Sequence, residues 1–299
     1  MIKVVWMTAG KRIGLLLISH GSPSQPWNAT MERVAGAVEK VLKSRRSNLF
    51  VKLSHLEFAK PDIADGCDSF EREGCDRILA YPLFISVSGH SEKDIPNALN
   101  IRYHDYADSE IRRYLGNVPV TYACPLDHGP VLPAVVAECA SELSEDPANE
   151  TVLVLSHGGG CDHFWNHMHA RVAAAIRAST GISSIESVAV GTGRAPASQD
   201  RLAQVVGEAQ KISGRRVLIL SCFGGLSGSQ FIERINEGLV RRGREQLEGL
   251  LGCSGWIERP AAIEEIANVV ERAANAAVGG NVSVTKVPPQ EQFPPYNLH

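Results

Sequence analysis

The sequence predicts an α/β protein made of two duplicated Rossmann-like lobes, each a mostly parallel four-stranded sheet flanked by helices, facing each other across a cleft. Short β-branched runs alternate with longer amphipathic stretches along the 299 residues. A motif also occurs twice: an apolar run ending in Ser-His-Gly, followed by Trp-Asn, includes His20 and returns at His157. A second marker follows each copy at nearly the same distance, with His90 in the first copy and Ser229 in the second. We therefore expect a duplicated domain whose second copy has exchanged one histidine for serine.

The first half is expected to hold four strands, each followed by a helix. Residues 13–19 form a near-continuous apolar run, which is typical of a parallel strand buried on both faces. Pro61 and Pro96 suit the first turn of a helix, where a missing N–H costs nothing. We expect strands at residues 13–19, 49–57, 77–84 and 118–123, and helices at about 28–43, from Pro61 onward, at 95–106 and at 131–143.

The second half repeats this order after a short polar linker, residues 144–149, which contains Pro147. Its expected strands lie near residues 151–156, 184–190, 216–221 and 252–256, with a last helix near 261–277. We expect an N-terminal lobe at 1–146 that carries the metal and catalytic residues, a C-terminal lobe at 147–279 with a degenerate site, and a Pro-rich tail at 280–299 that is extended or disordered.

Composition indicates a globular protein of the cytoplasm. The residues are 44% hydrophobic and 21% charged, and the net charge of −3 gives no reason to expect nucleic acid or a membrane as partner. Seven cysteines without a Cys-x-x-Cys pair suit a reducing compartment. We expect no signal peptide, and no apolar run approaches the roughly 18 residues of a membrane helix.

Three residues with metal-binding side chains are expected to meet at one edge of the first sheet. His20 ends the first strand, Glu57 ends the second, and His90 follows the third. Ligands of open α/β sheets bind outside the carboxyl ends of the strands. Imidazole and carboxylate can hold Co²⁺, Fe²⁺, Ni²⁺ or Zn²⁺, and they can also take protons from a substrate. For His20 alone, a hydrogen bond to the turn at Gly21-Ser22 is an equally good explanation.

The internal repeat favours function for two of these residues. His157 keeps the strand-end position of His20, so that histidine has a part in the architecture. In contrast, Ser229 stands at the position of His90, and about Thr192 at that of Glu57. Side chains that the fold can spare are better candidates for chemistry.

Several segments of the first half resemble the class II tetrapyrrole chelatases, more narrowly the long two-domain sirohydrochlorin cobaltochelatases and ferrochelatases. They are Ser19-His20-Gly21-Ser22, His55-Leu56-Glu57-Phe58-Ala59-Lys60-Pro61-Asp62-Ile63, Tyr81-Pro82-Leu83-Phe84 and Gly89-His90-Ser91-Glu92-Lys93-Asp94-Ile95-Pro96.

The resemblance implies a lyase-class enzyme without an organic cofactor, which inserts a divalent metal into sirohydrochlorin in cobalamin or siroheme biosynthesis. Cobalt is favoured and iron comes next, while nickel also suits imidazole. His20 and His90 would be the metal-binding and proton-accepting pair, and Glu57 would assist. The chain departs from many relatives at Ser22-Pro23, where they carry an arginine soon after the glycine.

The implied partners are the tetrapyrrole and the metal ion, bound by a monomer or homodimer. Backbone N–H groups at helix starts could bind the carboxylates of the tetrapyrrole. The substrate-binding candidates are Gly21, Ser22, Ser91, Lys93, His157 and Gly158, with Lys60 and Arg194 as weaker ones.

The sequence also bears on functions other than a chelatase. A non-catalytic carrier of metal or tetrapyrrole is the main alternative, although the joint presence of His20, Glu57 and His90 speaks against it. A serine hydrolase built on Ser227 is excluded, because the only later histidine is His299 at the end of the chain. A second cluster is either the polar start of a helix or an accessory metal site: Cys161, His163, His167 and His169.

Overall fold

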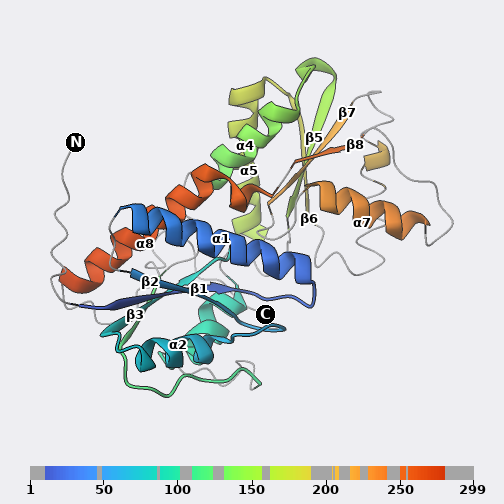
Figure 1. Cartoon of the computed structure of the whole chain (residues 1–299). Helices are drawn as coiled ribbons and strands as arrows, with labels where there is room; N and C mark the ends of the chain where they lie inside the picture. The colour runs from blue at the N-terminus through green and yellow to red at the C-terminus, as the bar shows by residue number, and fades with distance from the viewer. Residues whose placement is uncertain are drawn as a thin grey trace. The chain divides into compact units, whose positions relative to one another are not determined.

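The computed structural model contains two parallel four-stranded sheets flanked by helices, so the predicted fold class is confirmed (Figure 1). The strand order is β2-β1-β3-β4 in the first sheet and β6-β5-β7-β8 in the second, the same order in both copies of the repeat. The structure describes residues 11–45, 49–85, 88–101, 110–123, 131–156, 162–189, 204, 206–208, 216–222, 228–240, 250–253 and 255–279. Among these, no helix is long and apolar enough to cross a membrane.

The first sheet is built around β1, Ile13–Ser19, whose seven residues are all buried. β1 pairs with β2, Leu49–His55, and with β3, Arg77–Pro82, so that the carboxyl ends of the three strands lie together. β4, Val120–Tyr122, extends the sheet beside β3. The rim at these carboxyl ends is where the sequence placed its candidate site.

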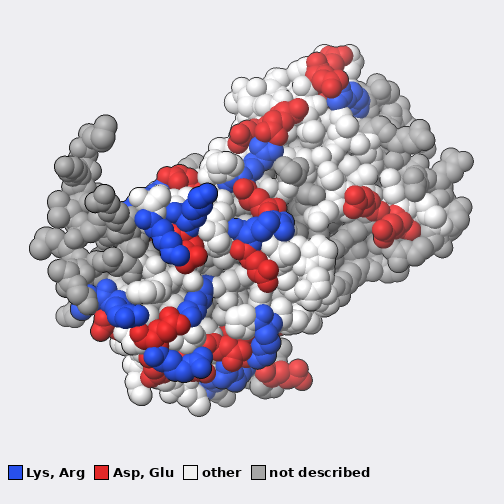
Figure 2. Space-filling view, in the orientation of Figure 1, with Lys and Arg blue, Asp and Glu red and all other residues white. Residues whose placement is uncertain are grey.

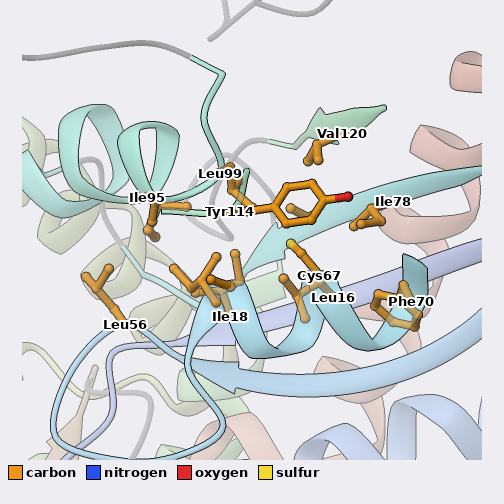
Figure 3. Packing of buried hydrophobic residues seen from close by; sticks show 14 of the residues in the cluster. Leu16, Ile18, Leu56, Cys67, Phe70, Ile78, Ile95, Leu99, Tyr114 and Val120 are labelled. Carbon is orange, nitrogen blue, oxygen red and sulfur yellow. The ribbon is translucent and has the colours of Figure 1, made fainter. Parts of the chain in front are cut away.

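Helices cover both faces of this sheet (Figure 1). α1, Gln25–Ser44, lies on one face, and α2, Ile63–Arg72, lies on the other. Cys67 and Phe70 of α2 face β1 in the core, where the ring of Tyr114 also lies (Figure 3). Burial of such side chains contributes roughly 1.5–3 kcal/mol each, which holds the sheet and its rim rigid.

The second sheet is built in the same way around β5, Glu150–Ser156, which is also buried throughout. Its partners are β6, Ser184–Ala189, β7, Arg216–Ser221, and β8, Leu250–Gly252. The helices described in this half include α4, Val131–Leu143, α5, Asp162–Thr180, and α7, Gly228–Val240.

The two compact units differ from the ranges 1–146 and 147–279 that we expected. α4 belongs to the second unit, which spans residues 128–262, because its apolar side chains pack on α5 and β7. The last helix, α8, Pro260–Gly279, belongs from Ile263 onward to the first unit. Arg45, at the end of α1, fixes it there by donating to Asn268 at 3.0 Å and to Glu271 at 2.7 Å, and it also pairs with Glu264.

Three predicted elements are wrong in extent. The strand expected at 49–57 ends at His55, so Glu57 lies in the loop after β2 and does not end the strand. The helix expected at 95–106 is α3, Ile95–Ala98, which follows a π-helical turn, His90–Asp94. Asn100, with φ 56°, ends it, because the N–H of Ile101 bonds to the carbonyl of Pro96 and that of Asn100 to Asn97. Residues 102–109 lie outside the described part of the chain, as does the tail 280–299.

The strand expected at 252–256 ends at Gly252, and Trp256–Glu258 forms a 3₁₀ turn instead. Short apolar runs do not reveal by their periodicity whether they form strand or turn. Charged side chains of both signs are mixed on the described surface shown in Figure 2, in keeping with the small net charge.

The loop that carries Glu57 is anchored at the start of α2 by Asp62. Its carboxylate accepts from the N–H of Asp65 at 2.7 Å, and the Asp65 carboxylate accepts in return from the N–H of Asp62. Arg112 donates to Asp62 at 3.0 Å, and Lys60 donates to it at 2.5 Å. Burial alone would raise the pKa of Asp62, but these hydrogen bonds outweigh it and hold the pKa well below its usual value.

We expect Asp62→Ala to lower the free energy of unfolding by about 1–2 kcal/mol at pH 7, because the helix loses its cap. Asp62→Asn keeps a capping oxygen and should cost less. Because the folded pKa is lowered, the stabilisation by the charge is present above the unfolded pKa of about 4 and is lost as the pH falls below it. Denaturant unfolding of the three proteins between pH 7 and pH 3 checks this. A difference between wild type and Asp62→Asn that does not shrink with falling pH would contradict it.

Candidate metal site

The structure brings His20, Glu57 and His90 together at the carboxyl rim of the first sheet. One ligand atom of each residue lies within 4.8 Å of the other two. The two imidazole rings meet edge to face, with centroids 4.9 Å apart. Among the residues that the structure describes, no other three His, Cys, Asp or Glu side chains form such a group. A single ion could therefore contact all three, which is what the sequence pattern predicted.

Each histidine uses its Nδ1 to hold its own ring. The Nδ1–H of His20 donates to the carbonyl of Gly21 at 2.9 Å, and the Nδ1–H of His90 donates to the carboxylate of Asp94 at 2.7 Å. In a neutral ring this places the remaining lone pair on Nε2. The hydrogen bond to the turn and a role as metal ligand are thus compatible at His20, since they use different nitrogens.

Gly21 lets the loop after β2 approach the loop after β1. It has φ 80°, and a Cβ there would lie 1.8 Å from the carbonyl oxygen of Glu57. The N–H of Glu57 donates to the carbonyl of His20 at 2.9 Å, so the two loops are also joined by their backbones. This contact places the acid beside the imidazole.

Phe58, next to Glu57, combines backbone strain with unusual exposure. Its φ is 60°, and the N–H of Ala59 bonds back to the carbonyl of Glu57 at 2.7 Å, a tight turn centred on Phe58. Its side chain is 65% exposed, and its ring lies nearly parallel to that of His20, with centroids 6.0 Å apart. The ring of Phe84 also lies beside this imidazole, with centroids 6.2 Å apart. Strained residues persist where the surrounding structure holds them and often lie at functional sites.

The predicted substrate-binding residues fall into three groups. Ser91 is buried, and its Oγ bonds the N–H and carbonyl of Ser88, so its hydroxyl is engaged within the turn. Lys60 is paired with Asp62 and Asp65. Gly21, Ser22 and Lys93 lie in or near the site and stay predictions. His157, Gly158 and Arg194 lie outside the described residues, as does Thr192, the residue expected at the position of Glu57.

Asn28, the asparagine of the first Trp-Asn pair, holds the turn beside the site. Its Nδ2 donates to the carbonyl of Ser22 at 2.8 Å, which ties α1 to the turn that follows β1. This bond stabilises the backbone around Gly21 and gives Asn28 a structural role.

His55 also lies near the site, on the buried side of the rim. It is 2% exposed, and its Nδ1 lies 2.7 Å from the Oγ of Ser19. Burial lowers its pKa, and the nearby Glu32 carboxylate opposes part of that effect. We take His55 as a neutral histidine of the core.

A cavity of about 930 Å³ adjoins the group of His20, Glu57 and His90 at Glu57. Its walls come from the start of α1, the loop after β2 and the segment before Tyr114. Both cations of its wall, Lys60 and Arg112, are paired with carboxylates. The lining includes the acids Glu32, Glu57, Asp62 and Glu110.

The second unit lacks this arrangement in its described part. Ser229 stands at the position of His90, and its Oγ donates to the carbonyl of Gly252 at 2.8 Å. His167 and His169 join no group of metal-binding side chains among the described residues, while Cys161 and the side chain of His163 lie outside them.

Comparison with known proteins shows which family the first half is similar to. Residues 14–143 match the model of the CbiX family. The resemblance to the class II chelatases is thereby confirmed, and with it the expectation of a lyase-class enzyme.

Two relatives and one solved structure illustrate this similarity. A sirohydrochlorin cobaltochelatase of Methanococcoides burtonii is 27% identical over 133 residues, 44% of this chain and 98% of the relative. The chloroplastic sirohydrochlorin ferrochelatase of Arabidopsis thaliana is 27% identical over 88 residues, 29% of this chain and 37% of the relative. The structure of SirB from Bacillus subtilis with Fe³⁺ shares the fold, with a TM-score of 0.61 at 16% identity over 89% of this chain and 97% of that one.

Two residues of the site were missed by sequence reasoning. Asp94 carried a usable signal, because an acid four residues after a histidine on a helical segment can reach it. Phe58 carried none, since neither its exposure nor its backbone conformation follows from the residue type.

We expect Gly21→Ala to separate Glu57 from the two histidines, because the new Cβ would collide with the Glu57 carbonyl. The affinity for Co²⁺ should fall by about 10-fold or more, the scale at which displaced metal-site residues act. Gly36→Ala is the matched control, since a Cβ on Gly36 of α1 meets nothing within 4 Å. Isothermal titration with Co²⁺ and thermal unfolding compare the two variants. Wild-type affinity in Gly21→Ala would show that the contact does not position Glu57.

Proposed function

We propose that this protein inserts a divalent metal ion into sirohydrochlorin, with Co²⁺ favoured and Fe²⁺ next. The observation that carries the proposal is the group of His20, Glu57 and His90 within 4.8 Å of one another. Relatives named sirohydrochlorin cobaltochelatase and ferrochelatase support the substrate.

The site can perform both halves of the reaction. The ion must exchange bound water for four ring nitrogens, and the macrocycle must lose two N–H protons. The Nε2 atoms of His20 and His90 can hold the ion while the pyrrole nitrogens replace them one at a time. The Glu57 carboxylate, as the acid of the group, can accept one proton, and an imidazole released from the ion can accept the other.

The choice of metal follows from the ligand set only in part. Two imidazoles and one carboxylate suit Co²⁺, Fe²⁺ and Ni²⁺. The order of binding affinity among these ions depends mainly on the ion itself and less on the particular ligands of the site. We place cobalt first because of the cobaltochelatase relative that is matched over 98% of its length. The ferrochelatase relative keeps iron second.

We expect His20→Ala and His90→Ala to lose on the order of 100-fold in rate of metal insertion, because each removes a ligand and a proton acceptor. His157→Ala, the histidine at the equivalent strand end of the second copy, should have a mild effect and serves as the control. The change in visible absorption of sirohydrochlorin, followed with Co²⁺, Fe²⁺ and Ni²⁺ in turn, measures the rates.

Other outcomes would assign a different role. A wild-type rate equal to the spontaneous one, with stoichiometric binding of metal or tetrapyrrole, would make the protein a carrier. An equal loss in all three variants would mean that both units share the chemistry.

A further inference from the structure

We infer that Asp94 is a positioning residue for metal binding: it holds the ring of His90 so that Nε2 faces the ion, and its charge strengthens that nitrogen as a donor. The inference rests on the proposed function, because it takes the group of His20, Glu57 and His90 as the metal site. Nothing in the family match assigns a role to Asp94.

The contact itself is close and sheltered. The Nδ1–H of His90 donates to Oδ2 of Asp94 at 2.7 Å, and the Asp94 side chain is 13% exposed. A hydrogen bond to a charged acceptor is about twice as strong as one between neutral groups. Carboxylates that accept from the second nitrogen of a metal-binding histidine fix its tautomer and its orientation.

The backbone is shaped to make this contact. His90 and Asp94 are the first and last residues of the π-helical turn, and the N–H of Ile95 closes that turn on the carbonyl of His90. The hydroxyl of Tyr122, from β4, donates to the carbonyl of Ser91 at 2.9 Å and so ties the turn to the sheet. π-turns are rare and are found mostly at functional sites.

The second copy of the repeat provides an internal comparison. Where Ser229 replaces His90, α7 is α-helical from Gly228 onward, without a π-turn. Glu233 keeps an acid four residues later, but it is exposed. The π-turn and the sheltered acid therefore accompany the histidine and are not demanded by the fold.

The two histidines of the site differ in their anchors. His20 donates to a neutral carbonyl, that of Gly21, whereas His90 donates to a carboxylate. A negative acceptor shifts electron density toward the opposite ring nitrogen, so Nε2 of His90 should be the stronger donor to a cation. Asp94 thus makes His90 the histidine that sets metal affinity.

The test uses the full chain and Co²⁺ alone, with Asp94→Asn, Asp94→Ala and the control Glu92→Gln from the same π-turn. We expect Asp94→Ala to weaken Co²⁺ binding 10- to 100-fold and Asp94→Asn, which keeps an acceptor without its charge, to lie between it and wild type. The visible absorption of bound Co²⁺ should change as His90 leaves the ion. In turnover, the KM for metal should rise and that for sirohydrochlorin should not. Glu92→Gln should match wild type throughout.

The outcomes separate this inference from the proposed function. A wild-type protein that binds Co²⁺ and metallates sirohydrochlorin, with Asp94→Ala equal to it in affinity and spectrum, overturns the inference alone. The inference is also overturned if Glu92→Gln loses as much Co²⁺ affinity as Asp94→Ala. It is overturned as well if the lost affinity of Asp94→Ala comes with a comparable fall in its melting temperature. Either result would mean that the substitution acts by disturbing the structure. A wild-type protein that neither binds Co²⁺ nor accelerates its insertion overturns the proposed function and the inference with it.

Discussion

The close approach of Gly21 to the carbonyl of Glu57 is the constraint on which the proposed metal site depends. Two loops that follow neighbouring strands come so near that no Cβ fits between them. Only this approach carries the acid of the β2 loop to the imidazole of the β1 loop. The strained turn at Phe58 persists because its neighbours are fixed by the sheet on one side and by the cap of α2 at Asp62 on the other.

The two imidazoles are oriented by their own surroundings and need no long network. His20 is held by the next residue, and His90 by an acid of the same helical turn. The strand order then brings the two rings together, because β1, which precedes His20, lies beside β3, which precedes His90. The second sheet keeps its order without a histidine at this position, since Ser229, at the place of His90, donates to the carbonyl of Gly252.

The convergence of His20, Glu57 and His90 could be predicted because the carboxyl ends of parallel strands share one rim. The strands of both sheets were predictable for a related reason, since a run such as residues 13–19 is too uniformly apolar for an exposed element. The turns were not predictable. Whether Trp256 continues a strand, or where the helix after Pro96 ends, depends on single backbone conformations such as that of Asn100. The role of Asp94 depends on such a turn as well.

By itself the sequence determined the order of the elements, the duplication and the chemical nature of the site, because each of these is written in local patterns of residue type. The tertiary structure alone decided which helix packs where and which polar groups touch. An amphipathic stripe shows that a face is buried but not against what, so α4 and α8 could be recognised as helices and not assigned to a unit. The same holds for Phe58, whose contact with His20 exists only once the loops after β1 and β2 have been brought to one rim.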